Sequence, residues 1–141
     1  MAVLKEKDRQ EIAKLLADLE QDVQLIMFTQ EHECEWCQVT REMVTELAEL
    51  SEKVTAEIHD FLADSELAQQ YGLDRVPAIV VRGAEDYGIR FYGVPAGYEF
   101  ASLLEAIQAV GRGAHGLPDA IVAKLAQIEK PVHLQVMVTP T

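Results

Sequence analysis

The sequence predicts an α/β domain in which helices flank a mixed central sheet of four strands. Three features predict this class. Segments with strand character occur in turn with segments of helical period. Two cysteines, Cys34 and Cys37, directly follow the first apolar run, and Val76-Pro77 directly precedes the third strand-like segment. Strands that alternate with helices are typical of α/β domains, and 141 residues fit one such domain or one with a piece of another.

The first helix is predicted over about Lys5 to Glu20, and the first strand over Val23 to Thr29. The helix is amphipathic because apolar side chains recur at the spacing of one helix face, at Ile12, Leu15, Leu16 and Leu19. The apolar run of the strand is continuous, which is typical of a central strand buried on both faces.

A second helix is predicted after the cysteines, because one of its faces carries the apolar side chains of Trp36, Val39, Met43, Leu47 and Leu50. The segment from Val54 to Asp60 alternates between apolar and polar residues, as a half-buried strand does. Asp64 or Ser65 is expected to cap a short third helix that ends at Gly72.

The last elements of this set are a hairpin and a helix. Strands over Ala78 to Arg82 and Ile89 to Tyr92, joined by a glycine-containing turn, predict an antiparallel pair. Gly97 precedes a helix whose apolar face carries Phe100, Leu103, Leu104, Ile107 and Val110. The glycine-rich segment 111–116 then predicts a flexible break. The expected order is therefore α, β, α, β, α, β, β, α.

Acidic residues number 24 and basic residues 12, which gives a net charge of −12. Such a chain repels nucleic acids and anionic membrane surfaces, so neither is expected as a partner. No stretch approaches the ~20 apolar residues of a membrane span. The segment from Met1 to Gln10 is charged and lacks the apolar region of a signal peptide. The expected location is the reducing cytoplasm, where an exchanging cysteine pair is catalytic more often than structural.

The Cys-x-x-Cys spacing at a strand-to-helix junction favours redox chemistry. It is expected to place Cys34 in the first turn of the helix and Cys37 one turn further on the same face. Free N–H groups and the helix dipole there favour a thiolate, which makes Cys34 the expected nucleophile and Cys37 the resolving thiol. The alternatives are an inert structural pair and half of a zinc site. A zinc ribbon needs a second cysteine pair, and no two of the four histidines have a spacing typical of zinc sites. No metal or organic cofactor is expected.

Three motifs give the chain a resemblance to a known family. They are Cys34-Glu35-Trp36-Cys37, the segment from Tyr71 to Ala78 and, most specifically, the segment from Arg90 to Phe100. The chain resembles the two-unit protein disulfide oxidoreductases, also called glutaredoxin-like proteins, and is similar to the N-terminal domain of the alkyl hydroperoxide reductase flavoprotein. The resemblance implies a thioredoxin-like fold and thiol–disulfide exchange with protein substrates. The intact cysteine pair favours the oxidoreductase branch, because the flavoprotein domain typically lacks cysteines in its first unit.

The resemblance also implies four substrate-binding residues. Val76 and Pro77 match the family's cis-proline, which lies beside the disulfide, and the backbone before it pairs with an extended substrate. Trp36 matches the aromatic residue that often precedes the second cysteine in glutaredoxins, where it either covers Cys37 and contacts substrate or packs on the core. Gly93 is expected to allow close approach of backbone near the groove or to form a turn.

The residues after the break repeat the start of the chain. Ile12 aligns with Ile121, and the same shift pairs Leu16 with Leu125, Leu19 with Ile128, Val23 with Val132 and Leu25 with Leu134. Pro118 suits the first turn of a helix, and Val132 to Val138 predicts a strand. The alternative is chance similarity between two amphipathic helix–strand units. We therefore expect residues 1–114 to form a redox-active unit and residues 115–141 to open a second, incomplete one. In the family a second Cys-x-x-Cys follows at the point where this chain stops, so a fragment or a shortened relative is expected.

Three functions remain open on this basis. The first is disulfide exchange with protein thiols. The second is electron relay for a thioredoxin-reductase-like flavoprotein or a peroxiredoxin, and the third is a metal or iron–sulfur module that uses the same thiols. The apolar tail, residues 115–141, is expected either to pack onto the first unit or to exchange with a second chain and give a homodimer.

Overall fold

The computed structural model describes residues 3–139 of the chain. Its elements follow the expected order, and the bounds of all four strands are as predicted. The elements are α1 (Glu6–Leu15), β1 (Val23–Thr29), α2 (Cys37–Ala48), β2 (Val54–Asp60), α3 (Ser65–Gln70), β3 (Ala78–Arg82), β4 (Ile89–Tyr92), α4 (Tyr98–Arg112) and α5 (Asp119–Leu125).

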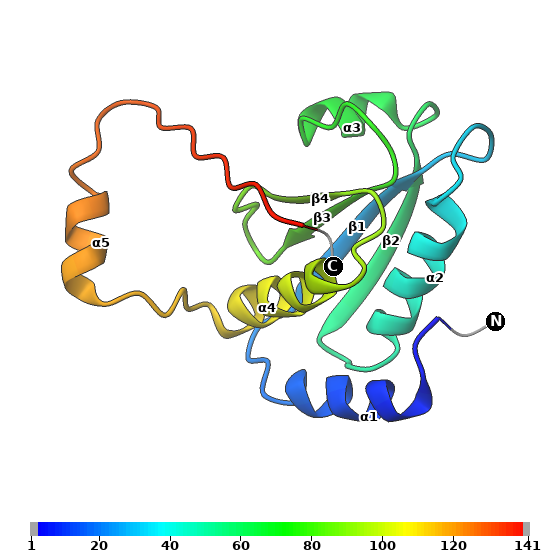
Figure 1. Cartoon of the computed structure of the whole chain (residues 1–141), viewed down its shortest axis with the longest axis horizontal. Coiled ribbons are helices and arrows are strands. Elements are labelled where there is room, and N and C mark those ends of the chain that lie inside the picture. The colour runs from blue at the N-terminus through cyan, green and yellow to red at the C-terminus, as the bar shows by residue number, and fades with distance from the viewer. Residues whose placement is uncertain (1–2, 140–141) are drawn as a thin grey trace.

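The four strands form one mixed sheet in the order β2-β1-β3-β4 (Figure 1). The β1 and β2 strands are parallel, whereas β3 is antiparallel to both β1 and β4. Phe28, near the end of β1, lies opposite both His59 of β2 and Ala78 of β3. The carboxyl end of β1 therefore meets the amino end of β3 at one edge of the sheet.

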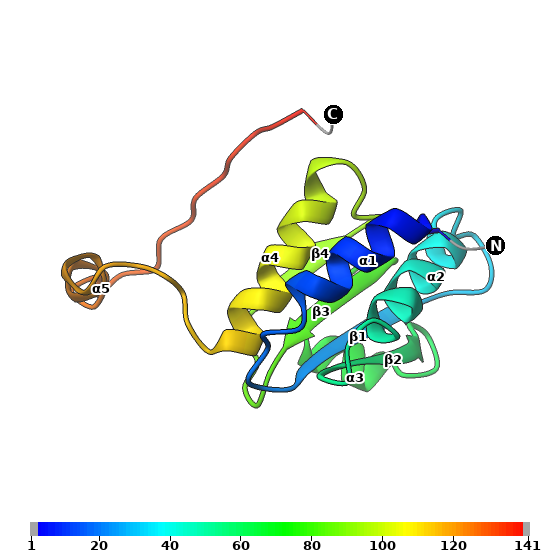
Figure 2. The same ribbon diagram turned by 90° about the horizontal axis from the view of Figure 1, so that it is seen from below.

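Three helices, α1, α2 and α4, lie next to one another over one face of the sheet, and the short α3 covers the other (Figure 2). The larger core contains, among others, Leu16, Leu25, Met27, Val44, Leu47, Ile79, Leu103 and Ile107. The smaller core, on the α3 face, consists of Ile26, Phe28, Ala68, Leu73, Ala78 and Val80. Apolar side chains on both faces of β1 explain why its sequence is a continuous apolar run.

Two predicted helix boundaries are wrong because tertiary hydrogen bonds decide them. The α1 helix ends at Leu15, and the backbone N–H groups of Glu20 and Gln21 donate instead to the carbonyl of Gly111. Gly111 was expected in the flexible break but lies inside α4, where an added Cβ would come within 2.5 Å of the Leu19 side chain. The helix ends only at Gly113, whose φ of 62° suits glycine.

The predicted side-chain cap of α3 is also wrong. Asp64 occupies the N-cap position, but its side chain forms no capping hydrogen bond. Its carboxylate instead accepts from the backbone N–H of Asp60 and lies 3.2 Å from Nδ1 of His59. The helix ends at Gln70, two residues before Gly72.

The tail forms a helix but not the predicted strand. The α5 helix follows Pro118, whereas no strand forms over 132–138 in the part of the chain that the structure describes. An extended segment becomes a strand only when a neighbour supplies hydrogen bonds, and the sheet contains only β1 to β4. The final two residues of the expected second unit, and the first two of the first unit, lie outside the described residues.

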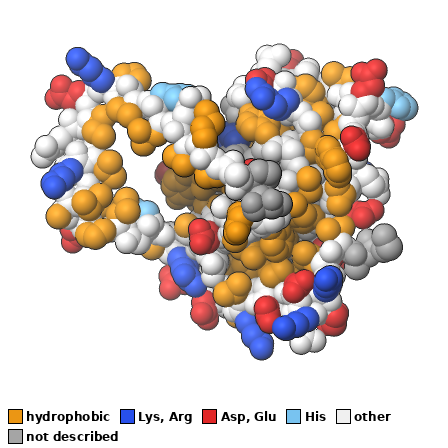
Figure 3. Space-filling model, in the orientation of Figure 1, with side chains coloured by type: hydrophobic (Ala, Val, Ile, Leu, Met, Phe, Trp, Pro, Cys, Tyr) orange, Lys and Arg blue, Asp and Glu red, His pale blue; other side chains and the backbone are white. Residues whose placement is uncertain are grey.

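The tail arches away from the sheet, and hydrophobic side chains line the arch (Figures 1 and 3). Leu134 is 86 % exposed, so the expectation that the tail packs onto the first unit is wrong for this structure. Other exposed apolar side chains of the tail are Ile121, Leu125, Ile128, Val132, Val136 and Val138.

Deleting residues 117–141 is expected to leave a folded, redox-active protein. The four strands and the helices α1 to α4 are complete before Leu117, and the deleted side chains are exposed where the structure describes them. Far-ultraviolet circular dichroism and a disulfide-exchange assay on the truncated chain test this expectation. An unfolded or inactive product would show that the tail belongs to the first core.

Candidate active site

Cys34 and Cys37 form a disulfide in the loop that joins β1 to α2, with their Cα atoms 5.5 Å apart. Cys37 is the first residue of α2, and Trp36 occupies the N-cap position. The prediction that Cys34 lies in the first helical turn is therefore wrong. The helix begins later because its first backbone hydrogen bond runs from the N–H of Thr40 to the carbonyl of Trp36.

The two cysteines differ in burial. Cys37 is 2 % exposed, whereas Cys34 is half-buried. A partner that approaches the surface therefore reaches Cys34 before Cys37. Trp36 is 52 % exposed, so the alternative in which it packs on the core is wrong.

The other predicted site residues meet at the carboxyl end of β1. The Val76–Pro77 peptide bond is cis, and Pro77 directly precedes Ala78, the register partner of Phe28. The backbone N–H of Gly93 donates to the carbonyl of Pro77 at 2.9 Å. Because β1 also leads into the cysteine loop, these residues and the disulfide belong to the same end of the sheet.

Gly93 has a conformational reason to be glycine. Its φ is 80°, a value that side chains with a Cβ rarely adopt. A Cβ built there would meet no atom within 4 Å, so the turn itself accounts for the residue. Close approach of a substrate backbone to Gly93 stays a prediction.

Sequence reasoning missed a charged pair beside the cis-proline. The guanidinium of Arg75 lies 5.4 Å from the ring centroid of Tyr92 and donates to the carboxylate of Asp74 at 2.8 Å. The hydrogen bond from Arg75 lowers the pKa of Asp74. Asp74 and Arg75 both lie within the motif from Tyr71 to Ala78, which was the available signal.

Arg90, at the start of the most specific motif, has a structural partner. Its guanidinium donates to both carboxylate oxygens of Asp86, at 2.8 and 2.7 Å, and its Nε donates to the carbonyl of Tyr71. The hydrogen bonds from Arg90 lower the pKa of Asp86 to about 2. Arg90 therefore ties the β3–β4 hairpin to the segment after α3.

Three carboxylates flank Cys34 in the cysteine loop: Glu31, Glu33 and Glu35. All three are exposed, and within residues 3–139 none forms an ion pair with a basic side chain. Glu33 has a φ of 57°, which is uncommon for a residue with a side chain. The loop thus places unneutralised negative charge next to the accessible cysteine.

The variant Glu35→Gln is expected to lower the pKa of the Cys34 thiol in the reduced protein. Nearby negative charge opposes formation of the thiolate, whereas the amino end of α2 favours it, and solvent screens the exposed carboxylates. The expected shift is therefore modest. Titration of thiolate absorbance in the variant and the wild type measures it, and an unchanged or raised pKa would reject the electrostatic argument.

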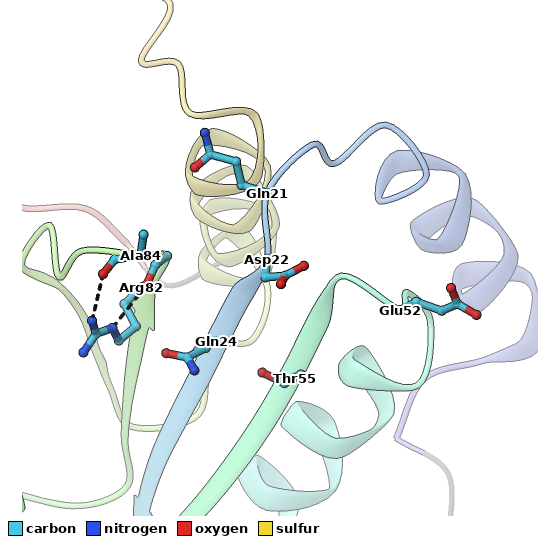
Figure 4. A pocket seen from close by; sticks show the side chains of 8 residues that line it. Gln21, Asp22, Gln24, Glu52, Thr55, Arg82 and Ala84 are labelled. Carbon is cyan, nitrogen blue, oxygen red and sulfur yellow. Dashed lines mark hydrogen bonds between the residues drawn. The ribbon is translucent and has the colours of Figure 1, made fainter.

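A polar hollow of about 620 Å³ lies at the opposite end of the sheet (Figure 4). Gln24, near the start of β1, pairs in register with both Thr55 and Arg82, and all three line it. The remaining lining residues are Gln21, Asp22, Glu52, Gly83 and Ala84. The cysteine loop follows the other end of β1, so this hollow does not belong to the redox site.

No protein-family model matches the chain. It is 29 % identical over 137 residues to the alkyl hydroperoxide reductase AhpF of Staphylococcus epidermidis, an alignment that covers 90 % of this chain and 25 % of that protein. The chain thus spans about a quarter of the length of that reductase. It is 39 % identical over 75 residues to a protein named "Probable Thioredoxin" from Methanothermobacter thermautotrophicus, covering 52 % of this chain and 80 % of that one.

Solved structures agree with these relatives. A protein disulfide oxidoreductase from Aeropyrum pernix superposes with a TM-score of 0.80 at 25 % identity, covering 89 % of this chain and 56 % of that one. The NTD_N/C domain of alkyl hydroperoxide reductase AhpF from Enterococcus faecalis gives 0.78 at 27 % identity, covering 86 % and 59 %. The resemblance inferred from the three motifs is confirmed. Within residues 3–139, no helix is long and apolar enough to span a membrane. With this fold, a Cys34–Cys37 disulfide and these relatives, the chain belongs to the thioredoxin family and is a thiol–disulfide oxidoreductase.

Proposed function

We propose that the chain exchanges disulfides with protein substrates, with Cys34 as the attacking thiol and Cys37 as the resolving thiol. The unequal burial of the two cysteines carries this proposal, because only the more exposed one is open to a protein partner. In the reducing direction, the thiolate of Cys34 attacks a substrate disulfide and releases one substrate thiolate. Cys37 then attacks Cys34, which forms the enzyme disulfide and releases the second substrate thiolate.

The substrate is proposed to lie across Trp36, Val76, Pro77 and Gly93. The exposed indole of Trp36 offers a flat apolar contact, and the other three residues lie together at the sheet end that leads to the disulfide. Exposed backbone at such an end suits a substrate held in extended form.

Pulse alkylation tests the assignment of the two thiols. The fully reduced protein is exposed briefly to iodoacetamide, denatured, and then treated with a second, heavier alkylating reagent. We expect the pulse to label Cys34 and the second reagent to label Cys37, as read by peptide mass. Equal labelling of both residues, or preferential labelling of Cys37, would contradict the proposal.

A second candidate is an electron-relay domain for a flavoprotein and peroxiredoxin system, in the reducing cytoplasm. The similarity to the alkyl hydroperoxide reductase AhpF favours it. The test is turnover with a thioredoxin-reductase-like flavoprotein compared with turnover by glutathione. Reduction by the flavoprotein alone would support the relay, and reduction by glutathione would support a glutaredoxin-like enzyme.

We also propose that residues 1–114 are the redox unit and that residues 115–141 open a second unit, through which two chains form a homodimer. The exposed apolar side chains of the tail support this reading, because apolar surface of this extent is seldom left in water. Sedimentation velocity on the full chain and on the chain without residues 117–141 tests it. A monomeric full chain would reject the dimer.

A further inference from the structure

Thr40 is a buried polar residue next to the resolving cysteine. Within residues 3–139 it is the one polar residue that is buried, at 0 % exposure. It follows Cys37 by three positions in α2, and side chains with this spacing share one face of a helix. The hydroxyl of Thr40 and the sulfur of Cys37 are therefore neighbours in a region that water does not reach.

The Thr40 hydroxyl can leave its present partner without leaving that partner unsatisfied. Its Oγ1 donates to the carbonyl of Trp36 at 2.7 Å. The backbone N–H of Thr40 donates to the same oxygen at 3.1 Å. A hydroxyl group carries one hydrogen that rotates, so it can turn to another acceptor while the N–H keeps the carbonyl bonded.

The resolving step creates the need for such a donor. Cys37 must become a thiolate before it attacks, and burial in apolar surroundings disfavours a thiolate. We infer that the Thr40 hydroxyl donates its hydrogen bond to the Cys37 thiolate during resolution and returns to the Trp36 carbonyl once the disulfide has formed. Thr40 then acts at the second step of exchange and not at the first.

The step balances without any further reactant. The thiol of Cys37 loses its proton to water, and its sulfur forms a bond to Cys34 as the bond from Cys34 to the substrate sulfur breaks. The substrate sulfur leaves with the electron pair and takes up a proton. The enzyme cysteines are oxidised to a disulfide, the substrate is reduced to thiols, and Thr40 keeps its own proton throughout.

The inference rests on the proposed roles of the two cysteines, so the test measures those roles as well. Reduced protein is mixed with an aryl disulfide, 5,5′-dithiobis(2-nitrobenzoic acid), in a stopped-flow instrument. Attack by Cys34 releases one coloured thiolate at a rate proportional to reagent concentration. Resolution by Cys37 releases a second at a rate independent of it. The variant Cys37→Ser should show only the first phase, and loss of that phase would contradict the proposed function itself.

The decisive variants are Thr40→Val, which removes the hydroxyl at nearly constant shape, and Thr40→Ser, which keeps it. A hydrogen bond to a charged group is lost in the first, so we expect the second phase to slow by about tenfold and the first phase to stay within about twofold. Thr40→Ser should resolve within about threefold of the wild type. Thr45→Val is the matched control, because Thr45 makes the same type of bond, to the carbonyl of Arg41 at 2.8 Å, on an exposed part of α2. It should leave both phases unchanged.

Two results would overturn the inference. One is a second phase in Thr40→Val that matches the wild type, and the other is a Thr40→Ser variant that resolves as slowly as Thr40→Val. If Thr40→Val does not fold, as judged by circular dichroism, Thr40→Ala takes its place. A folded Thr40→Ala variant must then show the same selective loss of the second phase, and a normal second phase in it would equally reject the inference.

Discussion

The variant Cys34→Ser is expected to lose disulfide reduction entirely, down to the uncatalysed rate, whereas Cys37→Ser should accumulate mixed disulfides through Cys34. The reason lies in the two positions. Cys37 is 2 % exposed at the start of α2, and Cys34 is half-buried in the loop before it. Without Cys34, no accessible sulfur is left to attack, and without Cys37, nothing in the chain displaces the bound substrate.

Insulin reduction followed by turbidity measures the loss, and intact mass under non-reducing conditions detects the trapped substrate. Both variants lack the disulfide, so the matched control is wild-type protein kept reduced, with thermal unfolding recorded for all three. Substantial insulin reduction by Cys34→Ser would show that the roles are assigned wrongly. A trapped species on Cys34→Ser, but not on Cys37→Ser, would show that they are reversed.

The strands could be predicted from the sequence because burial alone decides them. The run from Val23 to Thr29 has apolar partners on both faces of the sheet, and its bounds follow from composition. The helix ends depend on contacts between distant segments. Glu20 and Gln21 bond to the carbonyl of Gly111, and no local pattern in either segment encodes that meeting. The segment 132–138 has the composition of a strand, but composition does not supply a neighbouring strand.

The site shows the same division. The spacing of Cys34 and Cys37 and the position of Pro77 were sufficient to locate it. The start of α2 was not predictable to the residue, because Trp36 is the N-cap and provides no side-chain capping signal. Thr40 was missed because a threonine in a helix is usually exposed, and only packing shows that this one is buried. Its distance of three residues from Cys37 was the one available signal.

Phe28 holds together the α3 face of the sheet at the end that carries the site. It is fully buried in the smaller core, and its ring stacks on His59 at 5.3 Å between centroids and meets Tyr71 edge-on at 6.3 Å. It also lies opposite Ala78, the residue after the cis-proline. Removing its ring therefore takes away aromatic contacts and leaves a cavity in a core of few residues.

The variant Phe28→Ala is expected to lose about 3–5 kcal/mol of unfolding free energy. Domains of this size have about 5–15 kcal/mol in total, so the loss is a large share of the stability. Urea denaturation measures it as a lower midpoint. The matched control is Tyr98→Ala, in which the removed ring is 72 % exposed, and it should change stability by no more than about 0.5 kcal/mol. A loss below about 1 kcal/mol in Phe28→Ala would mean that the surrounding side chains collapse into the space. Because the α3 face adjoins Pro77, we expect disulfide exchange by the folded variant to fail at a lower temperature than in the control.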